Sequence, residues 1–115
     1  MEYKRSDRVG DLLVQVVSEL LLREVSDPRV GAVALTGAEV SPDLRHAKIY
    51  FNLLTGSGDK KEALKGLKSA AGFIRGRAGH TLQLRVVPTI DFVYDDTEER
   101  ARRIDELLQK TNKEG

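Results

Sequence analysis

The apolar residues near the start of the chain recur at steps of three and four, and this periodicity constrains the fold more than any other feature of the sequence. They are Val9, Leu12, Leu13, Val16, Val17, Leu20 and Leu21. Residues at this spacing lie on one side of an α-helix, which must pack against a second element to leave water. We predict a helix that Ser6 caps and that ends near Val25, because Asp27-Pro28 forces the chain out of helical geometry.

Two runs with strand character follow the helix, at residues 32–40 and 45–54. Ser41-Pro42-Asp43 lies between them and has the composition of a turn, so the pair is predicted to form a β-hairpin. The second run alternates apolar with polar residues, which indicates one face in a core and one in water. In the first run the apolar positions change parity at Gly37, which predicts a β-bulge there.

A second helix is predicted after the connector Thr55-Gly56-Ser57-Gly58, with Asp59 as its N-cap. Its apolar residues are expected to face the core, and its lysines lie mainly opposite them. The helical pattern is disturbed at Gly72 and resumes at Phe73 and Ile74. We therefore expect a helix that is bent or divided at this point.

The last strand is predicted over residues 82–94, with Pro88 inside it. Proline cannot donate a hydrogen bond to a neighbouring strand, so this strand must lie at a sheet edge or be kinked. Thr97 is then expected to cap a final amphipathic helix, which ends in a frayed tail at residues 111–115.

The chain has 115 residues, 40% hydrophobic and 32% charged, which suits one folded domain with a single core. We assign this domain to residues 1–96 and the C-terminal helix with its tail to residues 97–115. No cysteine is present, so disulfides and thiolate chemistry are excluded. The longest apolar stretch is interrupted by polar residues and is too short to span a membrane. A cytoplasmic location is the expectation.

Basic residues are concentrated in the second half of the chain. Residues 60–90 carry a net charge of +6 and the remainder carries −5, although the whole chain is only +1. A basic surface of this kind attracts phosphate groups. The ordinary solvated face of a helix is the more common explanation, because exposed lysines are frequent, and composition does not decide between the two interpretations.

The residues that catalysis or metal binding would require are scattered. His46 and His80 are far apart in the sequence and have no cysteine beside them, so no zinc-binding spacing occurs. The acidic residues between Asp91 and Glu99 are explained by a strand end followed by a helix N-terminus, where carboxylates are stabilised. We predict that the chain is not an enzyme and that it needs no cofactor or metal.

The order of the elements, with a break in the second helix, resembles the type II KH arrangement, in which nucleic acid runs past the break. More specific motifs are Ala70-Ala71-Gly72, which is followed by Phe-Ile-Arg, and a Leu-Arg-x-x-Pro stretch that ends at Pro88 and leads to an acidic turn. Arg5-Ser6-Asp7-Arg8-Val9 precedes the first helix, and Asp27-Pro28-Arg29-Val30 follows it. Together these motifs span nearly the whole chain and resemble the ribosome-binding factor A family, in which an Ala-x-Gly kink replaces the GxxG loop of other KH domains.

Gly76-Arg77-Ala78-Gly79 has the GxxG spelling itself. Only His80 and Thr81 separate it from the predicted strand, too few residues for the helix that follows a nucleic-acid-binding GxxG loop. We therefore place the kink at Ala70-Ala71-Gly72, and we expect Gly76 and Gly79 to weaken the helix after it, each by about 1 kcal/mol relative to alanine. Gly72 is the position expected to be sensitive to a β-branched replacement, if its φ is positive.

The resemblance implies an α+β fold of helix, strand, strand, helix, kink, helix and strand, with a mixed three-stranded sheet and a C-terminal helix. It also implies binding to the free small (30S) ribosomal subunit and 16S rRNA during late maturation and end processing, importance in the cold, a functional link to an assembly GTPase, and a monomeric state. The candidate RNA-binding residues are Arg5, Arg8, Lys65, Lys68, Ala70, Gly72, Arg75, Arg77 and Arg85, and Tyr50 is a candidate for stacking on a base. The alternative is a KH-like RNA-binding or protein-binding module with a different partner. A third possibility is a protein-interaction domain that docks a partner through the amphipathic helix at residues 97–112.

Overall fold

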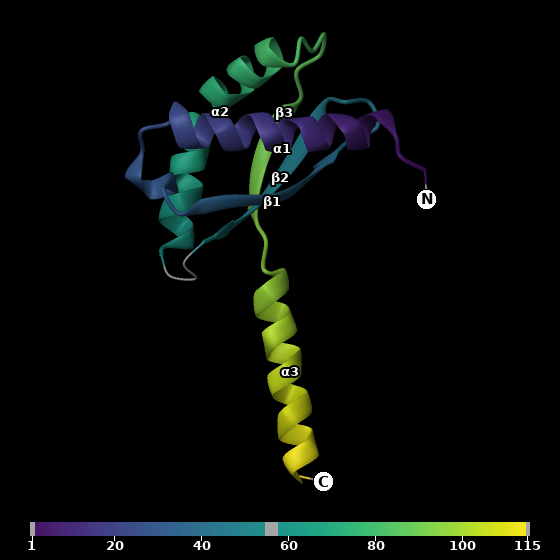
Figure 1. Cartoon of the computed structure of the whole chain (residues 1–115), viewed down its shortest axis with the longest axis vertical. Coiled ribbons are helices and arrows are strands. Elements are labelled where there is room, and N and C mark those ends of the chain that lie inside the picture. The colour runs from purple at the N-terminus through teal and green to yellow at the C-terminus, as the bar shows by residue number, and fades with distance from the viewer. Residues whose placement is uncertain (1, 55–57, 115) are drawn as a thin grey trace.

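The elements follow one another in the expected order (Figure 1). The structure is a computed structural model that describes residues 2–54 and 58–114. The elements are α1 (Arg5–Arg23), the 3-10 turn η1 (Pro28–Val30), β1 (Val33–Val40), β2 (His46–Leu53), α2 (Lys60–Thr81), β3 (Thr89–Tyr94) and α3 (Thr97–Glu114). The predicted α+β class is confirmed. None of the described helices is long and apolar enough to cross a membrane.

The sheet is mixed, with the strand order β1-β2-β3. β1 and β2 are antiparallel and joined by the predicted turn, in which the Ser41 hydroxyl donates to the Asp43 carboxylate at 2.7 Å. The register shifts between Leu35 and Gly37, which confirms the predicted bulge. β3 runs parallel to β2 and lies at an edge of the sheet, directly after Pro88, where the missing N–H of proline does no harm.

Both α1 and α2 contribute to one core on a single face of the sheet. From β2 the core receives Ala47, Ile49 and Phe51, each at most 2% exposed, whereas His46 and Lys48 are exposed on the other face. The helices supply Val9, Leu13, Val17 and Leu20 from α1 and Ala63, Leu67, Ile74 and Ala78 from α2. The apolar stripe of each helix is therefore what holds it to the sheet.

α2 is one continuous helix, and not two helices divided at a kink. Asp59 caps its start as predicted, because the carboxylate accepts the backbone N–H groups of Lys61 (2.9 Å) and Glu62 (3.3 Å). Figure 1 shows that α2 changes direction where it passes behind α1, so the expected kink is a bend inside the helix. Ser69 and Gly72 lie near the middle of α2 in the sequence, and such a pair of residues permits a bend.

Residues 82–88 form a loop, and the prediction that they begin the last strand is wrong. Gln83 turns the chain at the end of α2 with a positive φ of 53°. Further along the loop, the Arg75 guanidinium donates to the carbonyls of Val87 (2.8 Å) and Pro88 (3.1 Å). A side chain on α2, and not a neighbouring strand, satisfies these carbonyls, so the strand begins only at Thr89.

Two predicted helix caps are also wrong. α1 begins at Arg5, so Ser6 lies inside the helix and is buried, while the Asp7 carboxylate accepts the backbone N–H of Lys4 at 2.9 Å. Thr97 is the first residue of α3, and its backbone N–H donates to the Asp95 carboxylate at 3.0 Å. Each helix starts earlier than the sequence suggested, which changes the side chain that reaches its free N–H groups.

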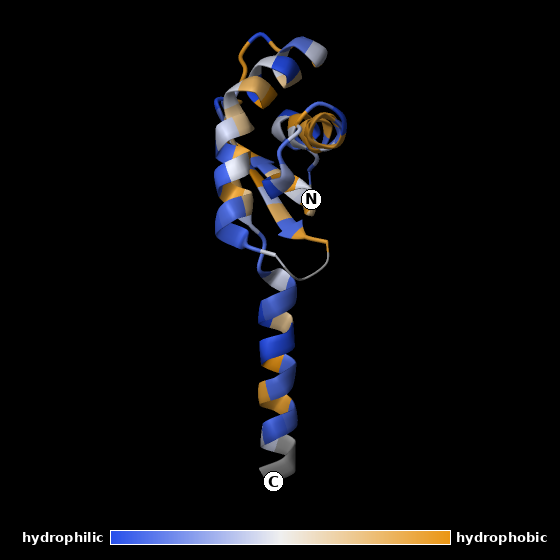
Figure 2. Cartoon of the chain, turned by 90° about the vertical axis from the view of Figure 1, so that its left-hand side faces the viewer, coloured by the Kyte–Doolittle hydropathy of each residue, from blue (hydrophilic) through white to orange (hydrophobic). Residues whose placement is uncertain are grey.

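α3 projects away from the sheet and the other two helices, with its apolar residues uncovered (Figure 2). Ile104, Leu107 and Leu108 are 57%, 62% and 58% exposed. The tail expected at residues 111–115 is helical as far as Glu114, and Gly115 lies outside the described residues, as do residues 55–57 of the predicted connector.

The first turn of α3 is tied to the rest of the molecule through one carboxylate. Glu99 accepts hydrogen bonds from the Tyr94 hydroxyl (2.6 Å) and the Lys60 ammonium (2.9 Å). These two hydrogen bonds and the Lys60 ion pair lower the pKa of Glu99, with the Tyr94 bond as the larger cause. The Lys60 ammonium also lies over the Tyr94 ring, 4.2 Å from its centroid. The junction therefore joins β3, α2 and α3.

Candidate nucleic-acid interface

The outer surface of α2 presents two of the predicted basic residues to solvent. Lys65 and Lys68 lie on it, because the apolar residues between them face the core. Lys65 forms an ion pair with Glu62 one turn before it at 3.3 Å, an exposed contact of small energetic weight. Lys68 forms no ion pair with any residue that the structure describes. Both ammonium groups are therefore accessible to a phosphate.

Arg75 has a different role from the one predicted for it. Its guanidinium is engaged with the backbone carbonyls of Val87 and Pro88, at 2.8 and 3.1 Å. Charge-assisted hydrogen bonds of this kind are stronger than neutral ones. Arg75 therefore fixes the loop at residues 82–88, and this loop carries the exposed residue Arg85.

Arg77 is likewise tied to another element. Its guanidinium forms an ion pair with the Glu24 carboxylate at 2.9 Å and so joins α2 to the C-terminal end of α1. The same guanidinium lies over the ring of Phe73, with Cζ 5.8 Å from the ring centroid. The Glu24 carboxylate offsets the charge of Arg77. The positive potential of α2 therefore comes mainly from its lysines.

The two small residues of the predicted kink lie in different surroundings. Ala70 is half-buried and packs against the core, so it supports the fold as well as the surface. Gly72 is exposed, and a Cβ atom at this position would meet nothing within 4 Å. Gly72 does not have a positive φ, because the described residues that do are Leu44, Gln83 and Gly58. The strain expected from a β-branched residue at Gly72 is therefore absent.

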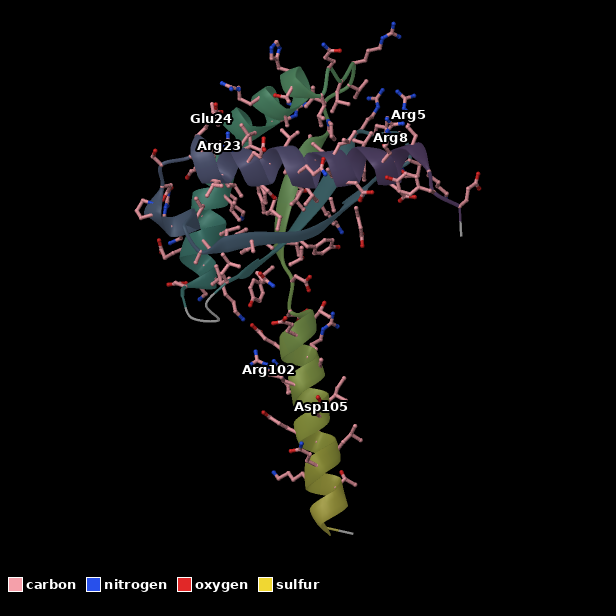
Figure 3. The ribbon with its side chains drawn as sticks, in the orientation of Figure 1. Arg5, Arg8, Arg23, Glu24, Arg102 and Asp105 are labelled. Carbon is pink, nitrogen blue, oxygen red and sulfur yellow. The ribbon has the colours of Figure 1, made fainter. Side chains whose placement is uncertain are left out.

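The remaining predicted residues are not gathered at α2. Arg5 and Arg8 are exposed at the N-terminal end of α1, and Figure 3 shows them at the opposite end of the helix from Arg23 and Glu24. Arg77 contacts Glu24, and a helix rises about 1.5 Å per residue, so Arg8 lies roughly 24 Å from this contact. The structure thus separates the basic residues into one set on α2, one at the start of α1, and Arg85 in the loop.

Tyr50 stands among acidic residues on the open face of the sheet. The pKa of its hydroxyl is raised, first by partial burial and then by the negative charge of Glu39, with a smaller effect of Asp95. Carboxylates at this position repel a phosphate backbone. The stacking role considered for Tyr50 is therefore disfavoured by its surroundings.

Phe73 is a surface residue that the sequence pattern did not identify. The sequence suggested that Phe73 and Ile74 together resume the apolar stripe, but neighbouring helix residues point about 100° apart, and here only one of the two faces the core. Ile74 is fully buried, whereas Phe73 is 45% exposed. The signal that was available in the sequence is that Ile74 alone continues the spacing from Leu67.

Three of the residues considered for catalysis have partners that serve the fold. The exposed side chain of His46 pairs through Nδ1 with the hydroxyl of Thr89 at 3.0 Å. Asp95 and Glu99 serve the start of α3 through the contacts described above. Among residues 2–54 and 58–114, no group of three or more His, Cys, Asp or Glu side chains could hold a metal ion.

The chain is similar to known proteins over most of its length. The model of the ribosome-binding factor A family matches residues 5–108. Ribosome-binding factor A of Halothermothrix orenii is 42% identical over 114 residues, which cover 99% of this chain and 93% of that protein.

Two structures of ribosome-binding factor A show the same fold. The crystal structure of ribosome-binding factor A from Thermus thermophilus has a TM-score of 0.70 at 17% identity, covering 80% of this chain and 97% of that one. A homology model of the Thermus thermophilus protein, fitted into a cryo-EM map of a 30S–RbfA complex, has a TM-score of 0.67 at 16% identity, covering 79% and 96%. At these identities the likeness concerns the fold.

Proposed function

The chain belongs to the ribosome-binding factor A family, and on this premise we propose that it binds the free small (30S) ribosomal subunit by contacting 16S rRNA. The observation that carries the proposal is the outer surface of α2. Lys65 and Lys68 lie there, and α2 contains no acidic residue after Glu62. Such a surface attracts a phosphate backbone without reading its base sequence.

We propose further that binding occurs during late maturation of the subunit, when the ends of its rRNA are processed, and that it matters most in the cold. The protein acts as a cytoplasmic monomer, catalyses no reaction and uses no cofactor. Its release is linked to an assembly GTPase. Contacts between lysine and phosphate support reversible binding of this kind, because their strength depends on the salt concentration.

Sedimentation of the protein with purified ribosomal particles tests the partner. We expect it to migrate with free 30S subunits and to be absent from whole ribosomes. Migration with whole ribosomes but not with free 30S subunits would contradict a role in subunit maturation. Migration with neither particle would favour a KH-like module with another partner.

Replacement of the two lysines tests the surface. Lys65→Gln together with Lys68→Gln should weaken binding to the 30S subunit and leave the fold intact. The slope of log affinity against log salt concentration should flatten by about one unit for each phosphate contact that is lost. The matched control is Arg102→Gln with Arg103→Gln on α3, which removes the same charge from another exposed helix and should change the slope less.

The exposed apolar stripe of α3 favours a second candidate function, the binding of a protein partner. Ile104, Leu107 and Leu108 are uncovered on a helix that stands clear of the core. Binding through these residues would depend on apolar burial and would change little with salt. A salt titration therefore separates this function from RNA binding.

A further inference from the structure

Phe73 is exposed on α2, the helix that carries Lys65 and Lys68, and takes no part in the core. Its side chain is 45% exposed, and it is absent from the residues that form or pack against the core, which include its neighbours Ala71 and Ile74. An exposed phenylalanine loses the stabilisation that burial would provide. Packing of the domain therefore does not account for an aromatic ring at this position.

The surroundings of the ring leave room for a ligand. Gly72 precedes Phe73, and Gly76 follows one turn later; a Cβ atom at either glycine would meet nothing within 4 Å. The guanidinium of Arg77 lies over the ring, 5.8 Å from its centroid, and the Glu24 carboxylate holds it there at 2.9 Å. The Arg77 guanidinium thus orients the ring. The helix surface is open at Gly72, just before Phe73, and at Gly76, one turn after it.

The charge of this surface selects the kind of partner. From residue 63 to the end of α2 the helix contains Lys65, Lys68, Arg75 and Arg77 and no acidic residue. The one carboxylate from another element that pairs with this stretch, among the residues that the structure describes, is Glu24, which contacts Arg77. An exposed aromatic ring beside a guanidinium, on a helix with solvent-facing lysines, fits a ligand with flat, unsaturated rings on a polyanionic backbone, and single-stranded nucleic acid has this chemistry.

We propose that Phe73 is a stacking platform for an unpaired RNA base, with Lys65 and Lys68 on phosphates farther along the same strand. The proposal rests on the proposed function and adds that the RNA bound along α2 is single-stranded. In a duplex the bases stack on each other, so their faces are not available to a side chain on the outside of a helix. The other aromatic considered, Tyr50, lies beside Glu39 and Asp95, which repel phosphate.

A single tryptophan provides the direct test, because the chain contains none. Phe73→Trp should bind a single-stranded oligoribonucleotide of about ten nucleotides, within the usual site size for such surfaces, at least as tightly as the parent. Its fluorescence should be quenched as the base stacks on the indole. An RNA duplex of equal length should cause little quenching. The matched control is Ile104→Trp, an exposed apolar position on α3 whose emission should not respond to either RNA.

The second variant removes the ring and keeps an apolar side chain. Phe73→Leu should fold normally and bind the single strand about 5- to 150-fold more weakly, the equivalent of about 1 to 3 kcal/mol for one stacked base. Phe73→Tyr should restore the affinity. Binding of the duplex should be the same for all three proteins.

Failure of this inference is distinguishable from failure of the proposed function. If Phe73→Leu binds the single strand like the parent and Phe73→Trp is not quenched, while the double lysine variant binds more weakly, the stacking role is wrong and the basic surface stands. If the lysine variant also binds normally, both proposals are wrong. If Phe73→Leu weakens binding to the 30S subunit but not to the single strand, the ring contacts a protein or folded RNA surface, and the stacking role is again overturned.

Discussion

Gly79 packs directly against Val87, in contact with the loop that follows α2. A Cβ atom built on Gly79 would lie 2.5 Å from Cγ2 and 3.0 Å from Cγ1 of Val87. Both are methyl groups of a β-branched side chain, which has little rotational freedom to move away. The loop therefore approaches α2 too closely for any residue larger than glycine at position 79. The low helix propensity of Gly79 is offset by this packing.

Gly79→Ala should lower the free energy of unfolding, whereas Gly76→Ala should raise it. Alanine gains about 1 kcal/mol of helix propensity at either position. At Gly79 overpacking costs about 1 to 3 kcal/mol and occasionally more, so we expect a net loss of about 1 kcal/mol. At Gly76 a Cβ atom meets nothing within 4 Å, so the gain remains. Urea denaturation of the two variants measures the difference; equal midpoints would contradict the packing of Gly79 against Val87.

Gly72→Val should leave the free energy of unfolding within about 0.5 kcal/mol of the parent, because valine and glycine differ little in helix propensity. Gly72 has open space around it and no positive φ, so the added side chain meets neither atoms nor strain. Thermal melting checks this. A loss above about 1 kcal/mol would indicate a strained turn at Gly72 in solution. Ala70→Leu is the comparison that should destabilise, since Ala70 packs against the core.

Arg75→Gln should destabilise the domain by about 1 to 2 kcal/mol, because it removes the two charge-assisted hydrogen bonds to Val87 and Pro88. Lys68→Gln is the matched control, with the same change of charge on the same helix and no ion pair to any described residue. We expect it to weaken binding to the 30S subunit and to leave the melting temperature unchanged. Equal melting temperatures for the two variants would mean that Arg75 does not hold the loop.

The junction with α3 should lose stability in acid. The folded-state pKa of Glu99 lies below its ordinary value of 4.5, first through the Tyr94 hydroxyl and then through Lys60. A group with a depressed folded pKa contributes stability above its unfolded pKa, and this contribution disappears as the pH falls through the folded pKa. The melting temperature of the parent should therefore exceed that of Glu99→Gln at about pH 6, and the difference should shrink as the pH falls below the ordinary pKa of a glutamate. A difference that stays constant down to about pH 3 would exclude Glu99 as its source.

Removal of α3 beyond its first turn should leave the domain folded. The apolar residues of α3 are exposed, so residues 101–111 contribute no buried surface to the core. A chain that ends at Arg100 keeps Glu99 and its two partners, and its melting temperature should match that of the full chain within about 4 °C, the shift that corresponds to less than about 1 kcal/mol. A large loss of stability would show that residues 1–96 do not form a domain on their own. Binding of the shortened chain to the 30S subunit tests the role of the α3 stripe at the same time.

The sequence by itself determined the elements that local chemistry specifies. The stripe from Val9 to Leu21 required a buried helix, the alternation along β2 required a half-covered sheet, and Asp59 marked the start of α2. The parity change at Gly37 even indicated the bulge. These features depend on residues that are close in sequence and on a period of 3.6 or 2, so they can be recognised without knowing what lies opposite.

Only the tertiary structure decided which basic and aromatic side chains are free to bind a ligand. Arg75 and Arg77 have the same sequence character as Lys68, yet the first binds the carbonyls of Val87 and Pro88 and the second pairs with Glu24. Phe73 and Ile74 are both apolar, and the direction of α2 relative to the sheet sets which of them is buried. The partners of Arg75 and Arg77 lie 12 and 53 residues away in the sequence and are brought close by packing of the whole chain. The local sequence pattern therefore does not indicate them.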